Sequence, residues 1–355
     1  MMHKIDVLVI GLGPAGAAAA SAAAAGGLSV VGVDRRQEIG MPVQCAEFIP
    51  LPMGKYAKAD GVLYQHIKGM KSFLPSGAVA ETEFPGLMIN RAAFDQAIAH
   101  QAREHGADLW LNSRLVDLDA ANSSARINTP AGEVIVEYTL LVAADGPHSL
   151  VADVLGLPEM EVVTTRQYTV PLKREYADTD IWLSADYPGG YAWLFPKGKW
   201  ANLGLGLDKR FATDMKIPLD GLHRQLIEQG LVGKEITYRT GGAIPVGGLR
   251  VNLVVGNIMF TGDAAGLTHP ITGAGIAAAV ISGERAGQAA VAFLQDEDED
   301  ALADFEEDVR DQFEVAVSRA VARRHWLDQY WKTDAAQTDS LHRKSWIAFP
   351  DYFLA

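Results

Sequence analysis

The chain has 355 residues, which is enough for two domains that share an interface. Hydrophobic residues make up 48% of it and charged residues 21%, proportions typical of a globular protein with a large core. The formal net charge of -13 argues against nucleic-acid binding, because neutralising phosphates requires clustered lysine and arginine.

The single cysteine, Cys45, excludes an internal disulfide framework and fits a reducing compartment. The first residues show no signal-peptide pattern. Outside an Ala/Gly-rich region, no apolar run approaches the about 18 residues of a membrane span. We expect a cytoplasmic protein, and whether it also rests on a membrane surface stays open.

The N-terminal residues predict a strand–helix–strand unit. Residues 5–10 form a β-branched run, residues 15–25 a small-residue helix, and residues 28–33 a second buried strand that ends at Asp34. The turn between the first strand and the helix reads Gly11-Leu12-Gly13-Pro14-Ala15-Gly16.

The glycines of this turn have separate roles in holding a dinucleotide. Gly11 permits the tight turn, Gly13 lets a pyrophosphate approach the backbone, and Gly16 lets the helix pack closely on the strand. The helix N-terminus then offers unpaired N–H groups to phosphate. Asp34 can accept hydrogen bonds from ribose hydroxyls, and Arg35 either stacks on adenine or is solvated.

The middle of the chain predicts further α/β elements and then a different type of structure. In order they are a helix over 91–105, strands over 114–120 and 125–128, a turn over 129–132, a strand over 133–137 antiparallel to the one before it, and a separate buried strand over 140–144.

From about residue 164 to 255 the strands alternate and are rich in Tyr, Trp and Thr. Residues 191–195 and 200–206 flank Pro-Lys-Gly-Lys and predict a hairpin, with one helix over 219–229. A buried strand over 257–261 and a long helix over 273–294 then resemble the N-terminal strand–helix–strand unit again. We therefore expect the N-terminal domain to be discontinuous in sequence.

Two more glycine-and-acid signatures follow buried strands. Asp145-Gly146 comes after the strand over 140–144, and Gly262-Asp263 after the strand over 257–261. A carboxylate at the end of a strand can hold ribityl or ribose hydroxyls, and the helix N-terminus after Gly273 can stabilise negative charge on a flavin ring. Together with the first signature they predict FAD, held by segments far apart in sequence.

We therefore predict an α/β protein with a Rossmann-like FAD-binding domain, a second, mostly antiparallel β domain for substrate, and a C-terminal helical segment. The FAD-binding domain is expected over 1–60, 86–160 and 257–295, the substrate domain over 61–85 and 161–256, and the helical segment over 296–355.

The C-terminal helical segment leaves two interpretations open. Residues 296–308 are densely acidic and form either a solvated helix face or a tail for a partner. The aromatic residues of 325–355 either pack against the second domain or face a lipid or a partner.

Further motifs resemble a known family. They are Pro42-Val43-Gln44-Cys45-Ala46-Glu47, Tyr191-Ala192-Trp193-Leu194-Phe195-Pro196 with Asn202-Leu203-Gly204-Leu205-Gly206, and Gly262-Asp263-Ala264-Ala265-Gly266 with its Pro-x-Thr-Gly-x-Gly-Ile continuation and Ser282-Gly283. Over roughly residues 5–295 the chain resembles glutathione-reductase-type flavoproteins with the p-hydroxybenzoate hydroxylase topology. Among these it looks most like the geranylgeranyl reductase family.

The sequence departs from these relatives at a few points. Gly266 stands where aromatic hydroxylases usually have histidine, and Ala274 replaces a frequent glycine or glutamate. The chain is also somewhat short for the family, which leaves a C-terminal cap over the substrate an open question.

The resemblance implies FAD-dependent reduction of isolated carbon–carbon double bonds in polyprenyl chains, which needs a hydride from flavin N5, a proton and an apolar tunnel. The family's active-site cysteine corresponds to Cys45, which either relays a proton or packs as a small hydrophobe. Glu47 either orients Cys45 or is a surface carboxylate. Arg91 opens its helix against the dipole preference and resembles the family's arginine near the cofactor.

The aromatic residues Tyr191, Trp193 and Phe195 share one strand face and either pack in the core or line the substrate channel. We predict Cys45, Tyr191 and Trp193 as catalytic residues. The predicted cofactor-binding residues are Gly11, Gly13, Pro14, Ala15, Gly16, Asp34, Arg35, Cys45, Ala46, Arg91, Val116, Asp145, Gly146, Gly262, Asp263, Gly273, Ala274, Gly275 and Ile276.

No metal site is expected, because His269 has no partner at metal-ligand spacing. The substrate is expected to be an apolar small molecule or lipid. The electron donor is NAD(P)H or a carrier protein such as ferredoxin, since there is no second dinucleotide fingerprint. Two alternatives stay open. One is a flavin monooxygenase or halogenase, since the Tyr-x-Trp-x-Phe-Pro strand faintly resembles the Trp-x-Trp-x-Ile-Pro motif of halogenases. The other is a flavin-binding protein without turnover.

Overall fold

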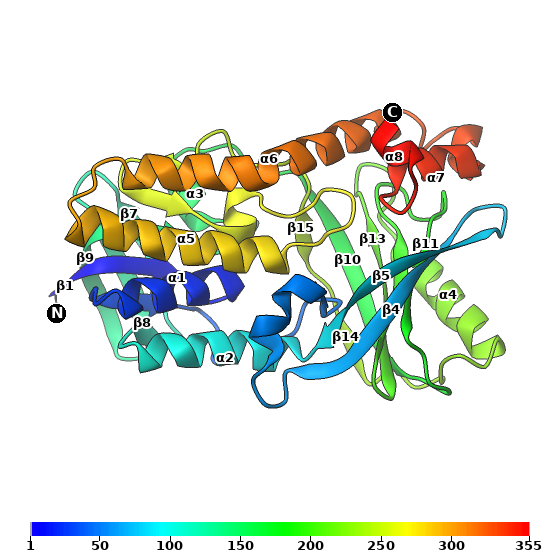
Figure 1. Cartoon of the computed structure of the whole chain (residues 1–355), viewed down its shortest axis with the longest axis horizontal. Coiled ribbons are helices and arrows are strands. Elements are labelled where there is room, and N and C mark those ends of the chain that lie inside the picture. The colour runs from blue at the N-terminus through cyan, green and yellow to red at the C-terminus, as the bar shows by residue number, and fades with distance from the viewer. Residues whose placement is uncertain (1, 355) are drawn as a thin grey trace.

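The computed structural model describes residues 2–354, whose strands form two separate sheets (Figure 1). The eight-stranded sheet has the order β16-β17-β9-β1-β2-β6, and β8 and β7 extend it from β9. The strands are β1 (Met2–Ile10), β2 (Val30–Val33), β6 (Asp108–Trp110), β7 (Arg114–Asp119), β8 (Ser124–Thr129), β9 (Gly132–Ala143), β16 (Val254–Val255) and β17 (Ile258–Phe260). The four pairs β17-β9, β9-β1, β1-β2 and β2-β6 are parallel, which confirms the predicted α/β class.

Helices pack on this sheet. They are α1 (Pro14–Ala25), α2 (Arg91–Glu104), the short α3 (Leu150–Val154) and α5 (Ile276–Gln295). Two of them, α1 and α5, contact each other through small residues. A Cβ added at Gly283 would stand 2.1 Å from the carbonyl oxygen of Ala15, and one at Gly287 would stand 2.6 Å from that of Ala19. The backbones of α1 and α5 therefore touch, which only very small side chains permit.

The second sheet has nine strands in the order β14-β10-β13-β12-β11-β4-β5-β3, with β15 paired to β10. They are β3 (Phe48–Pro50), β4 (Leu63–Phe73), β5 (Val79–Ile89), β10 (Val162–Pro171), β11 (Asp178–Trp182), β12 (Ala192–Lys197), β13 (Trp200–Leu207), β14 (Tyr238–Thr240) and β15 (Ala243–Pro245). All its described pairs except β11-β4 are antiparallel, as predicted. Helix α4 (Lys216–Glu228) buries Leu219, Leu222 and Leu226 against one face.

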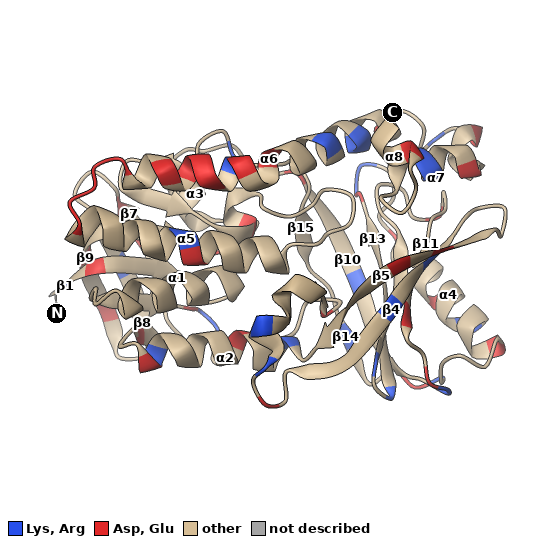
Figure 2. Ribbon diagram, viewed as in Figure 1, with Lys and Arg blue, Asp and Glu red and all other residues tan. Residues whose placement is uncertain are grey.

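The C-terminal segment joins the two parts of the molecule. Helix α6 (Ala301–Asp328) runs from the first sheet to the second, where η3 (Asp334–Gln337), α7 (Asp339–Ser345) and α8 (Asp351–Leu354) follow (Figure 1). Acidic residues gather on and before the start of α6 (Figure 2), and residues 295–300 are all exposed. This arrangement favours a solvated helix face, and a tail for a partner stays untested.

The structure corrects two predicted elements. The separate strands over 133–137 and 140–144 are one strand, β9, because β1 pairs with it across the junction, Ile5 with Tyr138 and Val7 with Leu140. Helix α5 begins at Ile276 and not at Gly273, because Gly273 has a φ of 67°, outside the helical range.

Three strands lie in a different sheet from the one that the predicted domain boundaries imply. β3 and the end of β5 belong to the second sheet, and β16 belongs to the first. The remainder of the division stays a prediction. Among residues 2–354, no helix has the length and apolar character needed to cross a membrane.

Candidate functional site

The first signature forms the turn between β1 and α1, and its glycines have different surroundings. A Cβ added at Gly11, whose φ is 93°, would lie 2.4 Å from the carbonyl oxygen of Ala144, and one at Gly16 would lie 1.8 Å from that of Gly11. A Cβ at Gly13 would meet no described atom within 4 Å. Gly11 and Gly16 therefore shape the turn, whereas Gly13 borders open space of the kind a phosphate needs.

Helix α1 begins at this turn, with Pro14 and Ala15 buried in its first turn. Its N-cap, Gly13, provides no side-chain hydrogen bond to the first N–H groups of the helix. Those groups and the positive end of the helix dipole are available to an anion.

Asp34 ties the second strand to the glycine turn. Its buried carboxylate accepts the N–H groups of Leu12 and Arg36, each at 2.8 Å. Because each carboxylate oxygen has two lone pairs, it can also accept a ribose hydroxyl. The neighbouring Arg35 is exposed.

Val116 lies in β7. The β7–β8 pairing shifts register between Leu115 and Asp117, so Val116 has no partner residue in β8. A role of Val116 in cofactor binding stays a prediction.

The three signatures converge at the carboxyl ends of the parallel strands, as predicted from the topology. Ala144, which follows β9, touches Gly11, and a Cβ at Gly262 would lie 2.9 Å from the Cβ of Ala15. A Cβ added at Gly275, the N-cap of α5, would lie 3.3 Å from Asp263 Oδ1.

The carboxyl groups of Asp145 and Asp263 differ in their partners. Asp145 Oδ1 is buried without a hydrogen-bond partner among the described residues, whereas Asp263 Oδ1 accepts the hydroxyl of Thr268 at 2.6 Å. Burial raises the pKa of both groups. A ligand with hydroxyl groups would supply the donor that Oδ1 of Asp145 lacks. The adjacent Gly146, with a φ of 89° and open space where a Cβ would stand, leaves room for it.

The loop before α5 is ordered by His269. Its Nδ1 accepts the N–H of Thr272 at 3.3 Å, and burial lowers the pKa of His269 to about 4, so the ring is neutral at pH 7. Ala274 is exposed on this loop, and Ile276 is the first residue of α5. No group of three His, Cys, Asp or Glu side chains within residues 2–354 is arranged to hold a metal ion.

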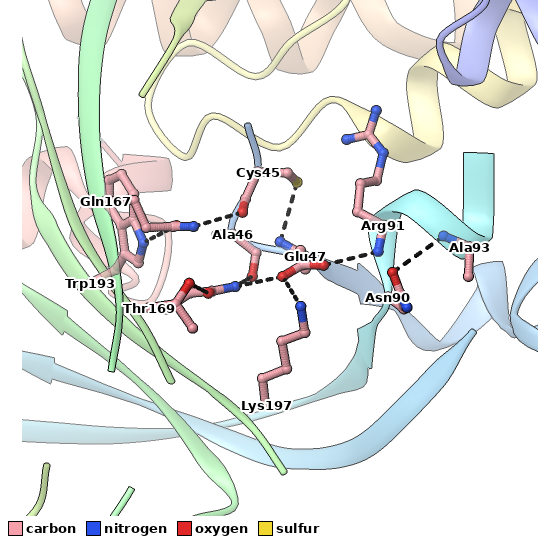
Figure 3. A network of polar contacts seen from close by, with 11 residues as sticks. Cys45, Ala46, Glu47, Asn90, Arg91, Ala93, Gln167, Thr169, Trp193 and Lys197 are labelled. Carbon is pink, nitrogen blue, oxygen red and sulfur yellow. Dashed lines mark hydrogen bonds and ion pairs between the residues drawn. The ribbon is translucent and has the colours of Figure 1, made fainter. Parts of the chain in front are cut away.

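The Cys45 loop is held by residues of the second sheet (Figure 3). The backbone N–H of Glu47 donates to Cys45 Sγ at 3.2 Å, and Gln167 Nε2 donates to the Cys45 carbonyl oxygen at 3.0 Å. Trp193 Nε1 in turn donates to Gln167 Oε1 at 3.1 Å. The position of the thiol is therefore fixed from β10 and β12.

Glu47 is a buried anchor of this loop, and its interpretation as a surface carboxylate is wrong. Its side chain is 2% exposed and its φ is 70°. One carboxylate oxygen accepts the N–H of Arg91 at 2.9 Å, and the other accepts Lys197 Nζ at 2.5 Å and Asn202 Nδ2 at 2.9 Å. Glu47 thus joins the start of α2 to β12 and β13 across the loop.

Arg91 points from the start of α2 towards the same region (Figure 3). Its Nε pairs with Asp95 Oδ1, one turn later, at 2.7 Å, which accounts for an arginine at a helix N-terminus. Burial raises the pKa of Cys45, while the positive charge of Arg91 opposes this shift. At neutral pH Cys45 is therefore a protonated thiol beside a guanidinium.

Tyr191, Trp193 and Phe195 form an aromatic wall with two residues of the C-terminal segment, Trp346 and Phe349. The rings of Tyr191 and Trp346 lie 4.9 Å apart, and the Tyr191 hydroxyl donates to the carbonyl oxygen of Thr272 at 2.5 Å. The C-terminal segment therefore covers this face, which confirms packing as one reason for its aromatic residues.

Sequence reasoning missed the residues that support the site. They are Gln167, Lys197, Asn202 and Trp346. Asn202 carried the clearest signal, because a polar side chain in the strand Trp-Ala-Asn-Leu-Gly-Leu requires a buried partner.

Comparison with known proteins identifies the family. A curated digeranylgeranylglycerophospholipid reductase of Methanosarcina acetivorans is 34% identical over 310 residues, which cover 82% of this chain and 76% of the relative. The chain belongs to the geranylgeranyl reductase family. The family model described as the geranylgeranyl reductase catalytic domain matches residues 161–242, in the second sheet. The resemblance predicted from the motifs is confirmed, and the chain is an enzyme, an oxidoreductase.

Other members and neighbours agree with this assignment. The digeranylgeranylglycerophospholipid reductase of Thermoplasma volcanium is 32% identical, covering 88% of this chain and 85% of its own. A crystal structure from Thermoplasma acidophilum is described as geranylgeranyl bacteriochlorophyll reductase-like. It matches this protein with a TM-score of 0.86 at 28% identity, and the match covers 97% of this chain and 92% of the other. The myxobacterial chondrochloren halogenase shares the fold alone, with a TM-score of 0.75 at 18% identity over 95% and 86% of the two chains.

Proposed function

We propose that this protein binds FAD and reduces carbon–carbon double bonds in the prenyl chains of a lipid, of the kind for which its curated relatives are named. The observation that carries the proposal is the placement of a protonated Cys45 and the Arg91 guanidinium next to the meeting point of the three glycine-and-acid signatures.

The described residues fit FAD from its ribose to its ribityl chain. Gly13 leaves open space at an uncapped helix N-terminus, which suits the pyrophosphate. Asp34 suits the ribose, and the unpartnered Oδ1 of Asp145 suits a hydroxyl of the ribityl chain. When bound, FAD supplies the hydride for one alkene carbon.

The chain's own residues handle the proton for the second carbon. Cys45 keeps its proton because burial raises the pKa of its thiol, so the proton is present when the alkene arrives. After transfer, the thiolate is stabilised by Arg91 and by the N–H of Glu47, which already points at Sγ. Tyr191 and Trp193 place an aromatic surface beside this point, which helps to exclude water.

Anaerobic incubation of the dithionite-reduced holoprotein with geranylgeranyl lipids, followed by mass spectrometry, tests the proposal. We expect products about two mass units heavier for each bond reduced. Oxygen-dependent products instead would identify a monooxygenase, and flavin that no alkene reoxidises would identify a binding protein without turnover.

The electron donor and the place of action are part of the proposal. The donor is NAD(P)H or a carrier protein such as ferredoxin, and stopped-flow reduction of the bound flavin by each one distinguishes them. A lipid substrate also favours peripheral contact with a membrane, which sedimentation with vesicles of the substrate lipid tests.

A further inference from the structure

An open hollow lies on the surface between the short 3-10 helix η1 (Leu51–Ala57) and the start of β4. Its lining contains both apolar and basic side chains, among them Leu51, Leu63, Leu87, Lys58 and His66. The site described above uses none of these side chains, so the hollow requires an explanation of its own.

Apolar side chains are exposed in and beside this hollow. Leu51 is 45% exposed and Leu63 is 43% exposed, and the neighbouring Tyr64 is 46% exposed. Single apolar residues scattered over a surface are normal, whereas several at one place indicate contact with a partner or a membrane. Tyrosine is common where an apolar phase meets water, because its ring is apolar and its hydroxyl is polar.

The charge at this place is opposite in sign to that of the whole chain. Residues 51–71 contain four lysines and one aspartate, whereas the formal net charge of the chain is -13. Figure 2 shows basic residues on η1 and along β4. Lys58 and Lys68 are exposed and pair with no carboxylate among residues 2–354. Their charges are therefore available to an anionic surface.

The hollow also lies next to the loop that carries the candidate site. Leu87 belongs to β5, which ends two residues before Arg91, and the paired strand β3 begins one residue after Glu47. Lys197 Nζ, which pairs with Glu47, lies 4.7 Å from the centre of the Tyr64 ring. A lipid that reaches this face is therefore close to the candidate site.

We propose that Leu51, Leu63, Tyr64 and Lys58 form a docking face for the surface of an anionic lipid bilayer. The apolar side chains enter the headgroup region, and the lysine pairs with lipid phosphate. Since the rest of this acidic chain is repelled by an anionic bilayer, the local positive charge also sets the orientation in which the protein lands. The docking rests on the proposed function, because a lipid substrate is what brings the protein to a bilayer.

Flotation of the holoprotein with vesicles tests the docking face. The vesicles are made of saturated phosphatidylcholine, with or without saturated phosphatidylglycerol, which is anionic. Neither lipid has a carbon–carbon double bond, so binding is measured apart from turnover. We expect binding to the anionic vesicles, about fivefold or more weaker binding to the neutral ones, and release at about 1 M salt, where charges are screened beyond about 3 Å.

Variants of the face identify which side chains bind. The double variant Leu51→Ser, Leu63→Ser should bind anionic vesicles about tenfold more weakly, and Lys58→Gln about fivefold more weakly. The matched controls are Ile217→Ser, at a 73% exposed residue of α4, and Lys234→Gln, at an exposed lysine, and both should bind as the wild type does. All these positions are exposed, so Tm should stay at the wild-type value.

Three results would overturn the docking face. They are no binding to either kind of vesicle, equal binding to both, and equal losses in the face variants and the controls. Reduction of detergent-dispersed substrate lipid by the face variants should proceed at the wild-type rate. A wild-type protein that docks on vesicles and reduces no lipid refutes the proposed function alone.

Discussion

Cys45 is a protonated thiol at neutral pH, next to a positive charge. The thiol accepts a hydrogen bond from its own loop and lies beside Arg91, yet burial keeps its pKa raised. A cysteine nucleophile requires the opposite arrangement, with a lowered pKa and a stable thiolate. The surroundings of Cys45 therefore keep the thiol protonated at neutral pH and argue against a nucleophilic thiolate.

Replacing Cys45 by alanine should separate chemistry from cofactor binding. We expect Cys45→Ala to keep FAD and to lose alkene reduction by about 100-fold or more, the usual contribution of a general acid. Flavin absorbance and single-turnover rates with a geranylgeranyl lipid measure the two properties. Cys45→Ser keeps a hydroxyl and should retain part of the rate, and wild-type turnover in the alanine variant would refute the role.

Glu47 places Cys45 through a buried charge. Glu47→Gln would leave Lys197, whose side chain is 17% exposed, without its counter-ion. Breaking a buried pair from one side lowers the free energy of unfolding by about 3 kcal/mol. Chemical denaturation measures this, and adding Lys197→Met should recover part of the loss. Strictly additive effects of the two substitutions would contradict a coupled pair.

At the scale of elements, we expect the glycines of the turn between β1 and α1 to differ in role, some serving the fold and one serving FAD binding. Gly13→Val should abolish FAD binding, because its side chain would fill the only open position of the three glycines, and the flavin-free protein should keep its Tm. Gly16→Val is the control: its Cβ would lie 1.8 Å from a carbonyl oxygen, so this variant should fail to fold. A Gly13→Val protein that is fully yellow would contradict the assignment.

Strand β11 contains a carboxyl group that titrates near neutrality. Asp180 is 2% exposed and accepts the hydroxyl of Tyr176 at 2.7 Å, and burial raises its pKa to about 7. The folded protein then binds this proton more tightly than the unfolded chain, whose aspartate has a pKa of about 3.9. The contribution of Asp180 to stability is therefore present below about pH 4 and is lost as pH rises to about 7.

Asp180→Asn removes this titration. The Tm of the variant relative to the wild type should rise between pH 5 and pH 8, as the wild type comes to carry a buried charge at about pH 7. Asp178→Asn, at a neighbour that is 29% exposed and faces Lys71, is the control. A constant Tm difference over this range would show that Asp180 does not titrate there.

At the scale of the whole molecule, the C-terminal segment covers the aromatic wall of the second sheet. Trp346→Ala should open the aromatic wall and lower the free energy of unfolding by about 3–5 kcal/mol. We expect KM for the lipid to rise about tenfold, equal to about 1.4 kcal/mol, with FAD binding unchanged. Tyr352→Ala, in the same segment but packed near Arg323, should destabilise the fold without changing KM. An unchanged KM in Trp346→Ala would exclude contact with the substrate.

The first glycine signature shows how much of the site can be predicted from local sequence pattern. Strand, turn and helix follow one another within residues 2–25, so the chemistry of Gly11, Gly13 and Gly16 depends on neighbours in sequence. Cys45 and Arg91 were also predicted, from motif resemblance. The partners of Glu47 were not, because Lys197 and Asn202 lie about 150 residues away and only sheet pairing brings them together.

By itself, the sequence determined the α/β class, the mostly antiparallel second sheet and the family, because each depends on periodicity and short motifs. Tertiary structure alone decided that β9 is one strand, that Glu47 is buried, and that Trp346 covers the aromatic wall. The physical reason is the same in all three cases. Burial and strand pairing depend on the segment that lies opposite in space, and the local pattern does not contain that segment.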